Sequence, residues 1–168
     1  MKEKGNMNYV EALASLRVDR AGRWGAQTNH RAPHKALMLL AVIHLISQGH
    51  DENLITFSDA LIGYYRALWR EALGSEPTMA QVAMPFYRLS SDGFWHLIQR
   101  TNEAQMQAGV RRLDTSRVML EALYIGVRLD DALFAAIVNP LDRAKLVQVL
   151  IDTYFANEAR NRLITWKG

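Results

Sequence analysis

The feature that most constrains the fold is an apolar run over Ala36–Ile46, which only His44 interrupts. A helix that is apolar nearly all round is buried, so this run predicts a helix inside a hydrophobic core. The run is too short to span a bilayer, which takes about 20 apolar residues. Pro33 suits the first turn of a helix and Gly49 the position after its end, so we predict a helix from Pro33 to Gln48.

Length and composition bound the class of protein. The chain has 168 residues, which suits one domain, and we expect a single domain over residues 1–168. Cysteine is absent, which excludes disulfides, thiolate catalysis and cysteine-ligated metals. The first ten residues, MKEKGNMNYV, contain no apolar stretch of the kind that a secretory signal needs. We therefore expect a cytoplasmic protein that does not interact with a membrane.

The remaining patterns predict further helices and one hairpin. Apolar periodicity and capping residues predict helices over 8–19, from Ser58 to Leu73, and over 115–124, 130–138 and 141–155, with a frayed or partner-dependent helix over 157–166. Residues 20–33 form a loop, and 54–57 form a turn or brief strand. Alternation over Met84–Arg100, with Asp92-Gly93 as the turn, predicts a hairpin. The expected fold is mainly α, a single compact helical domain with a small β-hairpin.

Positive charge gathers before the apolar helix. Of the 20 lysines and arginines, 15 are arginine, whose planar guanidinium binds phosphate bidentately. Between Ala12 and His50 the only acidic residue is Asp19. The same stretch contains Arg17, Arg20, Arg23, His30, Arg31, His34 and Lys35. We expect this stretch to face an anion, with a solvated basic surface as the alternative.

The sequence does not assemble a catalytic or metal centre. His30 and His34 have the spacing of zinc proteases, but Arg31 stands where those sites have a glutamate. No Gly-x-Ser-x-Gly elbow and no Walker-type phosphate loop occurs. We therefore expect a protein with no metal, no cofactor and no catalytic residues, which is not an enzyme.

An anion site at the start of the apolar helix fits the charges better. First-turn N–H groups of a helix are unpaired and its dipole favours negative charge. His34 and Lys35 lie in that turn, and Arg23, His30 and Arg31 precede it, which would suit a phosphodiester. The alternative is that Arg31 pairs with Asp92 or Asp114, while His34 caps the helix or packs in the interior.

Two motifs together resemble a known family. HRAPHKALMLLAVIHLI, followed some fifty residues later by MPFYRLSSDGFWHL, resembles the sulfur-binding domain of modification-dependent (type IV) restriction endonucleases, which recognise phosphorothioated DNA. The resemblance covers roughly Arg23 to Leu113. It implies a domain that binds double-stranded DNA in which sulfur replaces a non-bridging phosphate oxygen.

The resemblance also implies roles for individual residues. Arg23, His30 and Arg31 match the family's cationic residues, and with His34 and Lys35 they would hold the DNA backbone. Pro85 matches the proline of a shallow apolar sulfur pocket, in which we also place Met84, Tyr87 and Arg88. Arg111 or Arg112 would match an arginine that reaches a base edge in a groove. Phe86 is expected to fill the core.

Two departures from the family keep other functions open. The family has tyrosine at the position of Met84, and it commonly joins this domain to an HNH nuclease, whose motif is absent here. The expected partner is phosphorothioated double-stranded DNA, and the domain either works with a nuclease domain or subunit or reads the modification alone. The alternatives are a DNA-binding module indifferent to sulfur, or a protein-interaction domain that uses the helices over Asp130–Trp166, with Phe155 and Trp166 as anchors.

Overall fold

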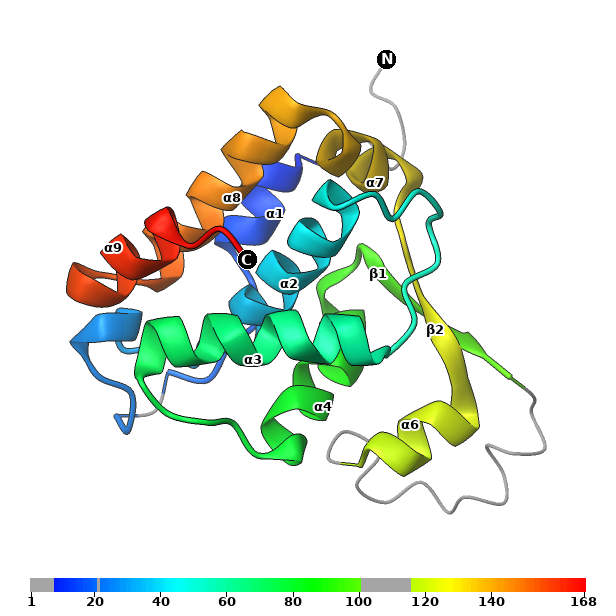
Figure 1. Cartoon of the computed structure of the whole chain (residues 1–168), viewed down its shortest axis with the longest axis horizontal. Coiled ribbons are helices and arrows are strands. Elements are labelled where there is room, and N and C mark those ends of the chain that lie inside the picture. The colour runs from blue at the N-terminus through cyan, green and yellow to red at the C-terminus, as the bar shows by residue number, and fades with distance from the viewer. Residues whose placement is uncertain (1–7, 21, 101–115) are drawn as a thin grey trace.

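The computed structural model describes residues 8–20, 22–100 and 116–168. They form a mainly helical domain around one buried helix, with a two-stranded sheet at one side (Figure 1). The elements are α1 (Tyr9–Ala14), η1 (Ala26–Thr28), α2 (His34–Ser47), α3 (Asp59–Leu73), α4 (Met79–Arg88), η2 (Leu89–Asp92), β1 (Trp95–Gln99), α6 (Arg117–Leu123), β2 (Tyr124–Leu129), α7 (Asp131–Val138), α8 (Pro140–Tyr154) and α9 (Asn157–Thr165). The expected mainly α class is confirmed.

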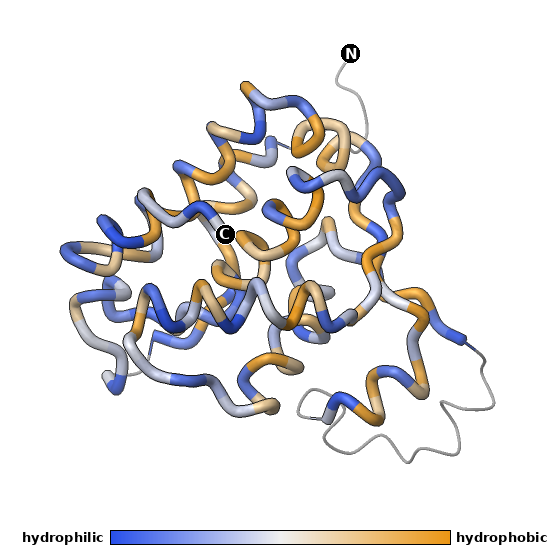
Figure 2. Tube along the Cα trace, in the orientation of Figure 1, coloured by the Kyte–Doolittle hydropathy of each residue, from blue (hydrophilic) through white to orange (hydrophobic). Residues whose placement is uncertain are grey.

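Helix α2 is the centre of the core, as its apolar sequence predicts. Every residue from His34 to Ile43 is buried. Helices α3, α4, α7 and α8 all pack against it, and Figure 2 shows its hydrophobic trace running through the middle of the molecule. Pro33 precedes its first turn and Gly49 follows its end with a φ of 113°, where a side chain would be strained. The predicted boundaries are therefore confirmed to within one residue.

Helix α3 begins and ends at the predicted residues. The Ser58 side chain accepts a hydrogen bond from the Leu61 N–H, and Gly74 closes the helix in a left-handed conformation. Its buried face includes Tyr65 and Trp69. Helix α3 packs between α2 and α9, so it joins the core to the C-terminal part of the chain.

The predicted hairpin is wrong in its first half, which is helical in the structure. Thr78 and Gln81 form a capping box that starts α4, and Met84 and Phe86 lie inside this helix. The residues of α4 and η2 buried at helical spacing are Val82, Ala83, Phe86 and Leu89. The alternation over 86–90 was therefore coincidental, because the burial period here is that of a helix.

The sheet pairs β1 with a strand that the sequence patterns did not suggest. Trp95–Gln99 runs antiparallel to Tyr124–Leu129. Residues 124–129 were divided between a predicted helix and the segment after it, whereas α6 ends at Leu123. Gly126 lies so close to the Ile55 carbonyl oxygen that a Cβ there would stand 2.5 Å from it. The brief strand considered for 54–57 is a single bridge from Ile55 to Val127.

A proline inside α4 creates a contact with α3. Pro85 has no N–H to donate to the Gln81 carbonyl one turn earlier. The hydroxyl of Tyr65, which is fully buried, donates a 2.7 Å hydrogen bond to that carbonyl instead. The break in the helix ladder thus fixes the turn that carries Met84 and Pro85 against α3.

The C-terminal helices complete the core. Helix α9 packs on α3, and Arg162 Nε donates to the Glu71 carbonyl at 2.7 Å, so this helix is joined to the rest of the domain. Phe155 is 1% exposed, so it cannot be the accessible anchor that the alternative protein-interaction function requires, and Trp166 is partly buried against the His44 ring. Among the described helices, none is both long and apolar enough to cross a membrane.

Replacing Tyr65 by phenylalanine should lower the free energy of unfolding by about 1–3 kcal/mol, because the Gln81 carbonyl is then buried without a donor. Urea unfolding measures this change. Tyr64→Phe is the matched control, since the neighbouring tyrosine is only partly buried, and it should change stability by no more than about 0.5 kcal/mol. Equal effects of the two variants would contradict the role given to the Tyr65 hydroxyl.

Candidate nucleic-acid interface

A cleft of about 950 Å³ opens between the segment that follows α1, the first turn of α2, and α4 with η2. Its residues come from three separate stretches of the sequence. They are Arg17, Val18, Asp19, Arg23, Trp24, Ala32, His34, Lys35, Ala80, Gln81, Met84, Pro85, Tyr87, Arg88, Ser90 and Ser91. The cleft therefore brings together much of the basic stretch and the MPFYR motif.

One wall of the cleft is the face of α4. Met84 and Arg88 are one helical turn apart and both line the cleft, together with Pro85 and Tyr87. Pro85 is buried, Met84 and Tyr87 are partly buried, and Arg88 is exposed. Phe86 points into the core, 1% exposed, as expected. This wall is apolar where Met84 and Pro85 lie and cationic at Arg88.

The opposite wall contains three of the five residues predicted to hold a DNA backbone. Arg23, His34 and Lys35 line the cleft, whereas His30 and Arg31 do not. The His30 Nδ1 lies 3.1 Å from the Trp24 carbonyl oxygen. The Arg31 guanidinium lies 5.6 Å from the centre of the Tyr154 ring, in cation–π geometry.

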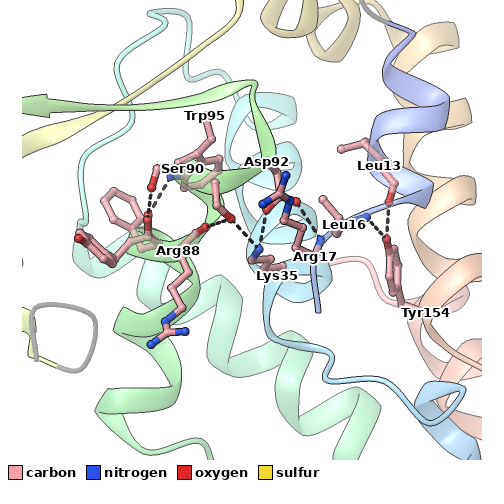
Figure 3. Close-up of polar contacts among 12 residues, drawn as sticks. Leu13, Leu16, Arg17, Lys35, Arg88, Ser90, Asp92, Trp95 and Tyr154 are labelled. Atoms are coloured by element: carbon pink, nitrogen blue, oxygen red, sulfur yellow. Dashed lines mark hydrogen bonds and ion pairs between the residues drawn. The ribbon is translucent and has the colours of Figure 1, made fainter. Parts of the chain in front are cut away.

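Lys35 forms a buried ion pair below the cleft. Its ammonium group is 2.6 Å from Asp92 Oδ2, and the two side chains are 9% and 4% exposed. The other carboxylate oxygen of Asp92 accepts the Arg17 N–H at 2.9 Å (Figure 3). The alternative pairing of Arg31 with Asp92 is therefore wrong, because Lys35 occupies this carboxylate, and Asp114 lies outside the described residues.

His34 is held as a neutral ring between two tryptophans. Its ring meets Trp24 edge-on at 5.4 Å and Trp69 at 5.3 Å. Burial lowers the pKa of His34 to about 4, with a smaller lowering by the Arg23 charge that Asp19 opposes. Its Nδ1 is buried and has no hydrogen-bond partner among the described residues. At neutral pH this residue contributes no positive charge, and it packs in the interior, which was the alternative considered for it.

Arg23 lies at the rim of the cleft in an exposed ion pair, whose acidic partner a ligand can replace. Its guanidinium pairs with Asp19, four residues earlier, at 2.6 Å, and its side chain is 71% exposed. Exposed pairs of this kind contribute little to stability, in the range of about 0–1 kcal/mol. A phosphate can therefore replace the carboxylate at small cost.

The loop before α2 is fixed in an unusual conformation. Asn29 and His30 both have positive φ, at 51° and 59°, which few side chains tolerate. The Asn29 amide donates to the Thr153 and Phe155 carbonyls at the end of α8. The backbone that carries His30 and Arg31 is thus held in place by the C-terminal helices.

The remaining predicted residues can be placed only in part. Arg111 and Arg112 lie outside the described residues. Within residues 8–20, 22–100 and 116–168, no group of histidines and carboxylates has the arrangement of a metal site. The sequence placed Arg17 in the basic stretch without giving it a role in the site, and Trp24 and Gln81 were not predicted as site residues. For Trp24 and Gln81 no local signal exists, because their place in the cleft results from tertiary packing.

A basic cleft with an apolar wall, carried on a helical scaffold, is suited to a nucleic-acid backbone. The chain belongs to the family of DNA sulfur-binding domains, since the family model described as ScoMcrA-like, DNA sulfur-binding domain, matches residues 6–168. The resemblance drawn from the two motifs is confirmed, and the match extends well beyond the stretch from Arg23 to Leu113. No curated protein matches the chain.

Acid should destabilise the domain through His34. Because its folded pKa of about 4 lies below its ordinary value of 6.5, the unfolded chain binds the proton more readily. Its contribution is therefore complete above about pH 6.5 and is lost as the pH falls towards 4, by about 3 kcal/mol in total. Urea unfolding at a series of pH values measures this loss.

The His34→Gln variant removes the titrating group and should flatten this part of the pH dependence. His96→Gln is the matched control, since His96 is half-exposed and pairs with Asp130. The same pH dependence in wild type and His34→Gln would contradict the buried neutral histidine.

Removing Lys35 should cost far more stability than removing Arg23. Lys35→Met leaves Asp92 buried without its cation, and the free energy of unfolding should fall by about 3–5 kcal/mol. Arg23→Gln breaks the exposed pair with Asp19 and should cost no more than about 1 kcal/mol. Thermal or urea unfolding of both variants tests this, and similar losses would show that Asp92 does not depend on Lys35.

Proposed function

We propose that this domain binds double-stranded DNA at a phosphorothioate, with the sulfur against Met84 and Pro85 and the charged backbone at Arg23 and Arg31. The observation that carries the proposal is that Arg23, Met84 and Pro85 line one cleft. Membership of the DNA sulfur-binding family supports sulfur-modified DNA as the ligand. The pocket and its residue roles are our inference from the geometry.

The chemistry of the two walls accounts for selectivity. Sulfur is larger, more polarizable and less strongly hydrated than oxygen, so it loses less when it leaves water for an apolar surface. An ordinary phosphate oxygen against Pro85 would lose a water without gaining a hydrogen bond, at a cost of about 1–3 kcal/mol. The thioether of Met84 is itself soft and adaptable, and it can pack on the sulfur where relatives have a tyrosine.

The remaining predicted residues take different parts in this proposal. Arg88, exposed on the same wall, would approach the backbone next to the sulfur, and Tyr87 would border the pocket. His30 would reach the backbone from the rim. Lys35 and His34 would act mainly by position, because the Lys35 charge is neutralised by Asp92 and the His34 ring is neutral.

We further propose that the chain is a recognition module without catalysis of its own, a single domain over residues 1–168. In that case any cleavage of DNA would be done by a nuclease domain or subunit joined to it. Arg111 and Arg112 would read a base edge in a groove, where a guanine contact adds about 1–3 kcal/mol of discrimination. Binding of cellular DNA would place the protein in the cytoplasm.

Fluorescence anisotropy on two duplexes of identical sequence, one with a single phosphorothioate on each strand, tests the proposal. The modified duplex should bind at least about tenfold more tightly, which is about 1.4 kcal/mol. Equal affinities would favour a DNA-binding module indifferent to sulfur, and no binding to either duplex would contradict DNA recognition by this cleft.

Variants of Met84 separate selectivity from affinity. Met84→Gln should bring the two affinities together by placing a polar amide against the sulfur, whereas Met84→Leu, which stays apolar, should preserve most of the difference. Arg31→Ala should weaken binding to both duplexes. If Met84→Gln keeps the selectivity of the wild type, the proposed binding of the sulfur against α4 is wrong.

A further inference from the structure

Arginines with no ion pair gather on one side of the cleft, and we call Arg17, Arg20 and Arg31 the arginine track. Within the described residues, none of these three guanidinium groups forms an ion pair with a carboxylate. Most other arginines that the structure describes are paired with acids, namely Arg23, Arg70, Arg117, Arg128, Arg160 and Arg162. Arg66, Arg100 and Arg143 also have no carboxylate partner among the described residues, but the three arginines of the track differ from them in lying on adjoining segments.

The three residues of the track lie on segments that run side by side. The Ala32 N–H donates to the Asp19 carbonyl at 2.8 Å, which joins the stretch after α1 to the stretch before α2. Arg31 lies over the Tyr154 ring. Burial raises the pKa of Tyr154, the Leu16 N–H and the charges of Arg31 and Arg20 lower it, and the Asp92 charge raises it, so these charged groups all act on this tyrosine.

The backbone below the track is fixed by buried side chains. The Tyr154 hydroxyl donates to the Leu13 carbonyl at 2.7 Å and accepts the Leu16 N–H at 2.9 Å. The next N–H, that of Arg17, donates to Asp92 (Figure 3). Arg17 and Arg20 are nevertheless exposed. The acids beside these arginines, Asp19 and Asp92, already pair with Arg23 and Lys35. The like charges that the rigid backbone holds together therefore repel one another, and the arrangement favours a polyanionic partner.

We infer that Arg17 and Arg20 bind phosphates of the duplex beside the modified one, and that they do so whether or not sulfur is present. The inference rests on the proposed function, because it assumes that the cleft binds DNA. Arg17 lines that cleft and Arg31 lies over Tyr154 at the end of α8, so the track extends from the cleft towards the end of α8. In this account the α4 wall determines selectivity and the track provides affinity that depends on salt.

Salt dependence of binding distinguishes the two contributions. Affinity falls as salt rises, and each phosphate contact makes the slope of log affinity against log salt more negative by about 0.9. The double variant Arg17→Gln/Arg20→Gln should make that slope less steep by about 1.8 if each side chain holds one phosphate. Between 50 and 200 mM salt, the difference between wild type and this variant should shrink by about 3.5-fold for each lost contact.

The full chain should be tested on both the modified and the unmodified duplex, with matched controls. Arg17→Lys/Arg20→Lys keeps the charge and should keep most of the slope. Arg70→Gln/Arg128→Gln removes the same net charge from arginines already paired with Glu76 and Asp131, and should change the slope little. Circular dichroism melts check that all variants are folded.

The outcomes separate this inference from the proposed function. A less steep slope in Arg17→Gln/Arg20→Gln, with an unchanged ratio of modified to unmodified affinity, supports the arginine track. If the slope of Arg17→Gln/Arg20→Gln is as steep as that of Arg70→Gln/Arg128→Gln, the inference is overturned, even if wild type prefers the modified duplex. A selective loss of binding to the modified duplex also overturns it, by placing Arg17 and Arg20 in the sulfur site. If wild type binds the two duplexes equally, sulfur selectivity fails while the slope still decides the track.

Discussion

The buried ion pair between Lys35 and Asp92 organises the side of this domain that contains the cleft. It joins the first turn of α2 to η2, and through the Arg17 N–H it joins both to the segment after α1. Removing two charges from water is costly, and apolar replacements of such pairs are often no less stable. The ion pair therefore matters because it holds these three segments in place, and they carry the residues of both walls of the cleft. Tyr154 fixes the same segment from the other side, at Leu13 and Leu16.

The electrostatics of the cleft differ from what its composition suggests. Of the cations near the start of α2, Lys35 is neutralised by Asp92, and His34 is uncharged between Trp24 and Trp69. The positive charge that a ligand meets is therefore carried by arginines at the rim. Arginine suits this place because its guanidinium stays charged and matches phosphate geometry. In the function that we propose, the apolar wall of α4 distinguishes sulfur from oxygen.

The sequence predicted the elements whose signals are local. The apolar run defined α2, and Ser58 and Gly74 marked the ends of α3. The family resemblance implied that Arg23, Met84 and Pro85 belong to one site, and all three line one cleft. The hairpin was misplaced because five alternating residues outweighed the capping box at Thr78, whose pattern was present in the sequence. Strand β2 and the burial of His34 depend on tertiary contacts with Ile55 and with two distant tryptophans, which no local pattern shows.

The central claim is that one cleft holds the sulfur against α4 while arginines hold the backbone. The most direct measurement is methyl NMR of the protein labelled at its methionine methyl groups and titrated with modified and unmodified duplex. The account predicts that the partly buried Met84 methyl shifts strongly with the phosphorothioate duplex and much less with the unmodified one at the same saturation. Met38, fully buried in α2, should remain nearly unchanged. A saturated complex in which the Met84 signal does not move would contradict the account.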